Sequence, residues 1–132
     1  APRNVRAHIT YGLALMQQNN QQLGIALETF ETACALSSSA KEEEMMEAHY
    51  NLGLLYNLVG RQKDAVATYE LALDCGNNIS AEPRFMAELY TNLGVALYDD
   101  NLTKDAMSAF ATALLFDPTF TDASNNLRAL RQ

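Results

Sequence analysis

The feature that most constrains the fold of this 132-residue chain is an internal repeat. Three segments share a pattern of small, apolar and polar residues around Gly12, Gly53 and Gly94, and these glycines are evenly spaced (53 − 12 = 41 and 94 − 53 = 41). A fourth, degenerate copy has Arg128 in the place of the glycine. Self-similarity at a fixed period is typical of arrays in which small units stack, and such arrays become stable at about three units.

Each full copy continues with a second pattern, alanine-x-x-x-aromatic-x-x-alanine, in which the aromatic residue is Phe30, Tyr69 or Phe110. Spacings of four and three residues place all three side chains on one face of a helix. Alanine permits two helices to approach closely, and the aromatic ring fills the space beside it. We therefore expect each copy to form a helical hairpin, with the glycine where its two helices lie closest together.

Turn-forming residues separate these patterns. Gly76-Asn77-Asn78 is expected to end a helix. Ser39 followed by Glu42 is a capping box that predicts a helix start near residue 40, and Ser80 ahead of Pro83 predicts a similar start. No strand pattern is present. The predicted helices span residues 4–18, 22–37, 40–59, 62–75, 81–99, 102–116 and 120–131.

These motifs resemble the tetratricopeptide repeat family, whose first helix carries Leu-Gly-x-x-Tyr and whose second carries Ala-x-x-x-Phe. The matching residues are Leu52-Gly53-x-x-Tyr56 with Ala65-x-x-x-Tyr69, and Leu93-Gly94-x-x-Leu97 with Ala106-x-x-x-Phe110 and Pro118. The 41-residue spacing exceeds the usual period of about 34. The resemblance implies an all-α fold, namely a right-handed α-solenoid of three helix-turn-helix repeats (about 4–38, 40–78 and 81–118) plus a C-terminal capping helix (about 120–131), forming a single domain.

The charge balance restricts the classes of partner. Nine Lys and Arg residues against sixteen Asp and Glu residues give a formal net charge of −7. Non-specific nucleic-acid binding depends on cations that neutralise phosphates, so it is not expected here. No apolar run approaches the roughly 18 residues of a membrane span, and no signal-like segment is present, so we expect a cytoplasmic location. Cys34 and Cys75 are too few for a disulfide scaffold and are interpreted as small core residues.

The sequence shows no catalytic or cofactor motif. It lacks a Gly-rich phosphate loop, a Cys-His pair and a Gly-x-Ser-x-Gly elbow. His8 and His49 occupy equivalent positions 41 residues apart (49 − 8 = 41), rather than the short spacing of a metal site, and are interpreted as packing residues. We predict that the chain is not an enzyme and requires no metal or cofactor.

In the tetratricopeptide repeat family the first helices line a concave groove, so the resemblance places the binding residues around each glycine. Asparagine recurs there, and an amide side chain can both donate to and accept from the backbone of an extended peptide. The alternative is that these asparagines make local helix contacts. The candidate peptide-binding residues are Leu13, Tyr50, Asn51, Leu54, Glu88, Asn92, Val95, Tyr98 and Asn126.

The same face carries an acidic series, in which Glu47, Glu88 and Asp122 follow Arg6 at equivalent positions. This series predicts a protein or peptide partner with apolar anchors and some Lys or Arg, although the acids could instead be solvated. Chaperone-binding members of the family hold a C-terminal carboxylate with a Lys/Arg clamp. The matching positions here are Ile9, Leu13, Asn51, Glu88 and Asn92, so we do not expect that class of partner.

The sequence therefore predicts a non-catalytic protein–protein interaction module that binds a peptide or protein segment in its concave groove. Two alternatives remain at this point. One is a substrate-recruiting segment of a larger enzyme, such as a glycosyltransferase. The other is self-association through the outer helices.

Overall fold

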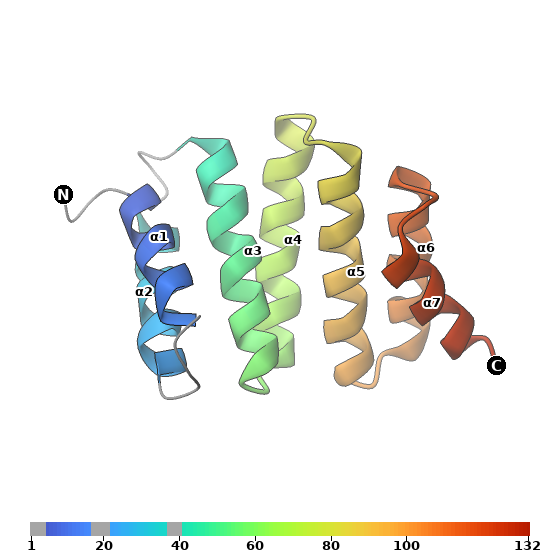
Figure 1. Ribbon diagram of the computed structural model, residues 1–132. Coiled ribbons are helices and arrows are strands. Elements are labelled where there is room, and N and C mark those ends of the chain that lie inside the picture. The colour runs from blue at the N-terminus through green and yellow to red at the C-terminus, as the bar shows by residue number, and fades with distance from the viewer. Residues whose placement is uncertain (1–4, 17–21, 37–40) are drawn as a thin grey trace.

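The computed structural model describes residues 5–16, 22–36 and 41–132, and these residues form an all-α structure without strands. Figure 1 shows the helices, which are α1 (Val5–Met16), α2 (Leu23–Ala35), α3 (Glu42–Leu58), α4 (Gln62–Asn78), α5 (Pro83–Asp99), α6 (Thr103–Phe116) and α7 (Thr121–Leu130). The all-α prediction is confirmed. No helix in this part of the chain is both long and apolar enough to cross a membrane.

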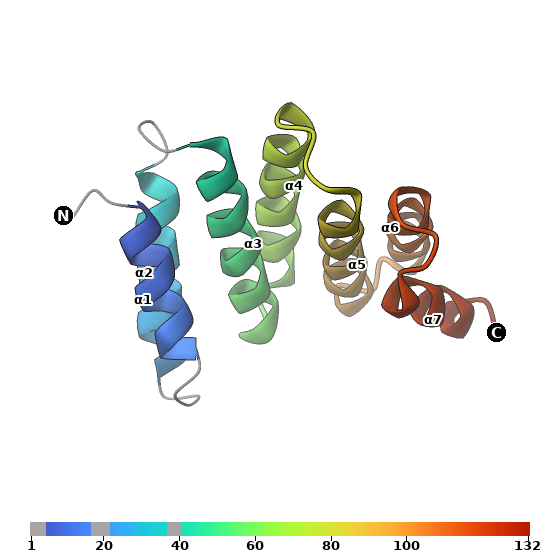
Figure 2. The ribbon, with the colours of Figure 1, turned by 45° about the horizontal axis from the view of Figure 1, so that its top comes forward.

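The helices form antiparallel pairs, α1 with α2, α3 with α4 and α5 with α6, and each pair packs on the next (Figure 1). The first helices α1, α3 and α5 form one layer, and the second helices α2, α4 and α6 form the other. The terminal helix α7 packs against α6, as the tilted view in Figure 2 shows. Packing between sequence neighbours is the architecture of an α-solenoid.

The two helices of each pair approach closely because the first helix carries a glycine, which has no β-carbon, at the point of contact. A Cβ added to Gly53 would lie 2.6 Å from Cε1 of Tyr69, whose side chain is almost fully buried. A Cβ at Gly12 would lie 2.7 Å from the Phe30 ring, and one at Gly94 would lie 2.5 Å from the Phe110 ring. The glycine of each first helix thus makes room for the aromatic ring of the second, as the repeat pattern predicts.

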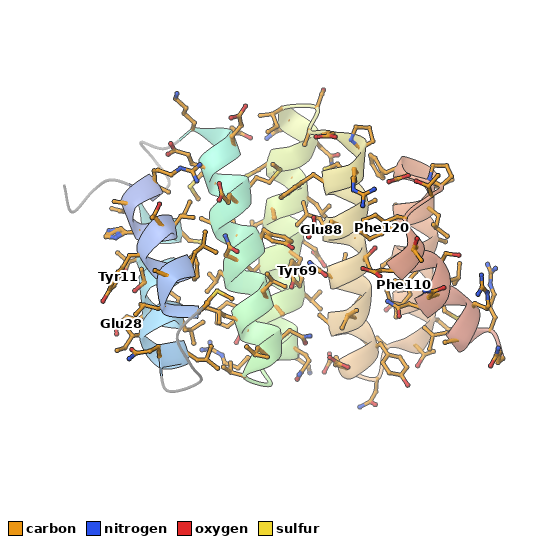
Figure 3. The ribbon with its side chains drawn as sticks, viewed as in Figure 1. Tyr11, Glu28, Tyr69, Glu88, Phe110 and Phe120 are labelled. Atoms are coloured by element: carbon orange, nitrogen blue, oxygen red, sulfur yellow. The ribbon has the colours of Figure 1, made fainter. Side chains whose placement is uncertain are left out.

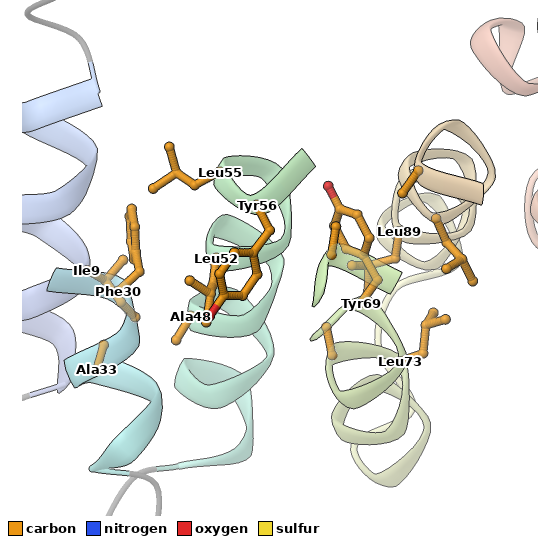
Figure 4. Packing of buried hydrophobic residues seen from close by; sticks show 14 of the residues in the cluster. Ile9, Phe30, Ala33, Ala48, Leu52, Leu55, Tyr56, Tyr69, Leu73 and Leu89 are labelled. Carbon is orange, nitrogen blue, oxygen red and sulfur yellow. The ribbon is translucent and has the colours of Figure 1, made fainter. Parts of the chain in front are cut away.

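One apolar cluster runs from α1 to α5 and includes Ala109 of α6, and two smaller clusters lie around α6 and α7. Figure 4 shows Phe30 beside Ile9 between α1 and α2, and Tyr69 on the side of α4 that faces Leu89 of α5. The first alanine of each alanine-x-x-x-aromatic-x-x-alanine motif is fully buried; these residues are Ala26, Ala65 and Ala106. Each aromatic side chain therefore packs between the two helices of its own hairpin. Tyr69 also contributes to the interface with the following hairpin.

The structure corrects the predicted end of the fourth helix. The segment Gly76-Asn77-Asn78 does not end the helix at residue 75 but forms its last turn. Gly76 is buried, and a Cβ there would meet Sδ of Met86 at 2.6 Å. The missing side chain of Gly76 therefore allows α4 and α5 to pack closely and does not serve a turn. The chain instead reverses through Ser80, which has a positive φ of 51°.

The helix starts also differ from the capping predictions. Helix α5 begins at Pro83 with Glu82 as its N-cap residue, so Ser80 does not cap it, although Pro83 occupies the first turn as expected. Helix α3 begins at Glu42 with Lys41 as its N-cap residue. Ser39, the other half of the predicted capping box, lies outside the described residues.

Candidate protein-binding groove

A cavity of about 580 Å³, here called the N-terminal pocket, lies between the first helices α1, α3 and α5. Its apolar lining consists mainly of Leu13, Met46, Tyr50 and Phe85. The turn between α4 and α5, residues 79–82, closes one side of it. Of the candidate residues, Leu13, Tyr50 and Asn51 line this pocket.

Carboxylates surround this apolar surface. Glu43, Glu47 and Glu82 line the N-terminal pocket. Among its described lining residues, the one cation is Arg6, whose Nη1 lies 2.7 Å from Oε2 of Glu47. This ion pair joins α1 to α3 and neutralises Glu47, whereas Glu43 and Glu82 leave a negative rim that favours positively charged groups.

Tyr50 is held in place by two contacts with α5. Its hydroxyl donates a hydrogen bond of 2.6 Å to Oε1 of Glu88, and its ring packs against Phe85 with centroids 5.4 Å apart. Figure 3 shows Glu88 on the side of α5 toward α3. Burial and the hydrogen bond to Glu88 raise the pKa of Tyr50 above its usual range, so Tyr50 stays a neutral donor. The pocket wall is therefore preorganised.

A second cavity of about 310 Å³, the C-terminal pocket, is lined by residues of α5, α6 and α7. Its lining residues are Val95, Tyr98, Phe110, Asn126, Ala129 and Leu130. Six of the candidate residues thus separate into two groups, one in each pocket, whereas Glu88 and Asn92 line neither. Leu54 is half-buried on α3 and lines neither pocket.

The asparagines do not form one continuous series. Asn51 is 5% exposed, and its Nδ2 donates a 3.0 Å hydrogen bond to the backbone oxygen of Glu47, one turn earlier in the same helix. This is the local helix contact that the alternative interpretation describes. Asn92 is half-buried on α5, while Asn126 lies in the C-terminal pocket.

Sequence reasoning missed several lining residues of the N-terminal pocket. Phe85 lies three residues before Glu88 on the same face of α5, so helical spacing could have identified it. Ile79 and Glu82 could not be found in this way, because they belong to the turn after α4. Only the packing of that turn against the first helices brings them to the pocket.

Residues 47–74, which cover most of α3 and α4, match a family model described as tetratricopeptide repeat. This segment is similar to a tetratricopeptide repeat. No curated protein sequence matches the chain. The family resemblance seen in the sequence is therefore confirmed in the central hairpin, where the glycine and aromatic motifs are most complete.

Solved structures share the fold of the whole chain. The N-terminal domain of stress-induced protein-1 from C. elegans superimposes with a TM-score of 0.80 at 18% identity, covering 97% of this chain and 94% of that domain. MamA gives a TM-score of 0.81 at 19% identity, covering 98% and 67%. The tetratricopeptide repeat domain of Arabidopsis FLU gives 0.73 at 19% identity, covering 84% and 92%. The chain thus has the fold of a tetratricopeptide repeat solenoid.

The histidine and cysteine side chains outside the pockets are not arranged as a metal site in the part of the chain that the structure describes. Within the described residues, no group of three or more His, Cys, Asp or Glu side chains is placed to hold a metal ion. Cys34 and Cys75 are half-buried rather than fully buried. Burial raises the pKa of the Cys34 thiol to about 12 and also raises that of Cys75, so both thiols stay protonated at neutral pH.

His49 occupies an aromatic position of the tetratricopeptide repeat and is half-buried, with a buried Nδ1 that has no hydrogen-bond partner. Burial lowers its pKa below the usual value of 6.5. Because the folded state disfavours the imidazolium, His49 should contribute stability above the unfolded-state pKa, and this contribution should be lost as the pH falls below about 6.5.

We therefore expect the free energy of unfolding to fall more steeply below pH 6.5 in the wild type than in His49→Phe. The extra slope should stay under about 1.4 kcal/mol per pH unit, the limit for one proton. Urea unfolding between neutral and mildly acidic pH measures it. Carboxylate titrations are common to both proteins, so they largely cancel in the difference. Parallel pH profiles for the two proteins would show that His49 is not the group responsible.

Proposed function

We propose that this chain is a protein–protein interaction module that binds a peptide or protein segment on the face formed by its first helices. The tetratricopeptide repeat fold supports the general role. The observation that carries the specific proposal is the N-terminal pocket, which combines an apolar lining with an acidic rim on that face. A module of this kind could act alone or recruit substrates for an attached enzyme, and the binding step is the same.

The pocket suits an apolar side chain followed or preceded by Lys or Arg. Its volume of about 580 Å³ is within the range of pockets that bury a small ligand. Leu13, Met46 and Phe85 offer apolar contact, and Glu43 and Glu82 attract the neighbouring cation. Because contacts with Phe85 and Glu88 already hold Tyr50, little side-chain entropy is lost on binding.

A C-terminal carboxylate is not proposed as the ligand. Such a group would meet the carboxylates of Glu43 and Glu82, and Arg6 of the pocket lining is already paired with Glu47. Ile9, one of the positions that a carboxylate clamp would use, is fully buried and does not reach the groove surface. The charge and burial at these positions therefore favour basic peptides over acidic ones.

Selection of peptides from a random 12-residue phage library tests the proposal. We expect the selected peptides to place Lys or Arg beside an apolar residue. Removing both rim charges in E43Q/E82Q should weaken binding of the best peptide by about three- to tenfold, as expected for two partly exposed charge pairs. Fluorescence polarisation with the synthetic peptide measures the dissociation constant.

The matched control is E70Q/D74N, which removes two exposed carboxylates from α4, away from both pockets. Equal weakening by both double variants would indicate a general charge effect and contradict binding at the pocket. Enrichment of acidic peptides, or of none, would also contradict the proposal. Light scattering at the titration concentrations detects the alternative of self-association, for which the exposed Leu71 of α4 and Leu115 of α6 are available.

A further inference from the structure

The two pockets are connected by one face of a single helix. Phe85, Glu88, Asn92 and Val95 follow one another on α5 at spacings of three, four and three residues, which places them on the same side of the helix. Phe85 lines the N-terminal pocket, and Val95 lines the C-terminal pocket. The pockets therefore lie toward opposite ends of α5.

The helix geometry sets the distance between the pockets. Phe85 and Val95 are ten residues apart (95 − 85 = 10), which corresponds to about 15 Å along the axis. The N-terminal pocket lies on the α3 side of α5 and the C-terminal pocket on the α7 side, which adds a sideways step of about 8–10 Å. The resulting diagonal of roughly 17–18 Å corresponds to between five and six residues of extended chain at about 3.3 Å per residue, and six is the nearest even number.

The surface of α5 between the pockets is polar, and one of its side chains, Glu88, already accepts a hydrogen bond. Glu88 accepts the hydrogen bond from Tyr50, and Asn92 lies one turn further along α5. Both are half-buried, and together they offer carboxylate and amide groups to a passing main chain. An extended segment has unpaired backbone N–H and C=O groups to bond with them, whereas a helix has already paired its own. This chemistry favours an extended occupant.

We propose that the groove binds one extended segment with two apolar side chains six residues apart, the first flanked by Lys or Arg in the N-terminal pocket and the second in the C-terminal pocket. An even spacing is required because side chains alternate between the two faces of an extended chain. This inference rests on the proposed function and adds to it a second anchor and a defined spacing.

Synthetic peptides with an Arg-flanked leucine and a second leucine 3, 6, 7 or 14 residues away, separated by Ser and Asn, test the spacing. A peptide without the second leucine is the reference, and each peptide is made in both sequence directions. We expect the six-residue spacing to bind about tenfold more tightly than the reference, and the other spacings to bind like the reference. Fluorescence polarisation with the full chain measures the affinities.

The variant Ala129→Glu places a charge in the C-terminal pocket at an exposed position. It should abolish the tenfold advantage of the six-residue peptide without changing the affinity of the reference peptide. Ala67→Glu, at an exposed position of α4 outside both pockets, should preserve the advantage.

The outcomes separate this inference from the proposed function. Equal binding of the reference and of every two-anchor peptide would overturn the second anchor while supporting a single-anchor groove. Tightest binding at 14 residues would indicate a helical occupant and overturn the extended geometry. Absence of binding by all of the peptides, including the reference, would count against both proposals.

Discussion

Replacing Tyr69 by alanine is expected to lower the free energy of unfolding by about 3–5 kcal/mol, which is typical for removal of a buried aromatic ring. Tyr69 is 1% exposed, fills the space beside Gly53 and belongs to the same core cluster as Leu89 of the next hairpin. Its loss leaves a cavity that the rigid helix pairs can close only in part. Urea denaturation followed by circular dichroism measures the change.

Tyr98→Ala is the matched control, because it makes the same chemical change at a side chain that is 50% exposed. We expect it to change the free energy of unfolding by under about 1 kcal/mol. Similar losses for the two variants would mean that the ring of Tyr69 does not contribute through burial at the hairpin interface.

Replacing Gly53 by alanine is expected to destabilise the protein by about 1–3 kcal/mol through overpacking. A Cβ at this position would lie 2.6 Å from the Tyr69 ring, which is too close for any undistorted contact. Alanine is the better helix former by about 1 kcal/mol, so the contact must outweigh that gain for the net effect to be a loss. Equilibrium unfolding in urea provides the measurement.

The control is Gly24→Ala, at a glycine of α2 where an added Cβ would meet nothing within 4 Å. It should be neutral or stabilise the protein by up to about 1 kcal/mol. The double variant G53A/Y69A should lose less than the sum of the two single variants, because both act on one contact. Stabilisation by both glycine substitutions would contradict the close approach of α3 and α4.

Part of the candidate groove could be predicted from helical spacing together with the family resemblance. Leu13, Tyr50 and Asn51 were placed on one surface from their positions around the repeated glycines, and all three line the N-terminal pocket. The spacing could not show that Asn51 donates to its own helix, or that Val95 and Tyr98 line a separate pocket. These outcomes depend on rotamers and on the distance between helices, which a repeat pattern does not specify.

The amino-acid sequence by itself determined the helices and their hairpins. The pairing of Gly53 with Tyr69 and the buried alanines act between segments close in sequence, so a local pattern is enough to specify them. Only the tertiary structure decided where α4 ends, because Gly76 serves its contact with Met86 and not a turn. It also decided that the turn at residues 79–82 walls the groove and that Tyr50 bonds to Glu88, 38 residues away. The physical reason is that such contacts depend on how one hairpin is positioned on the next.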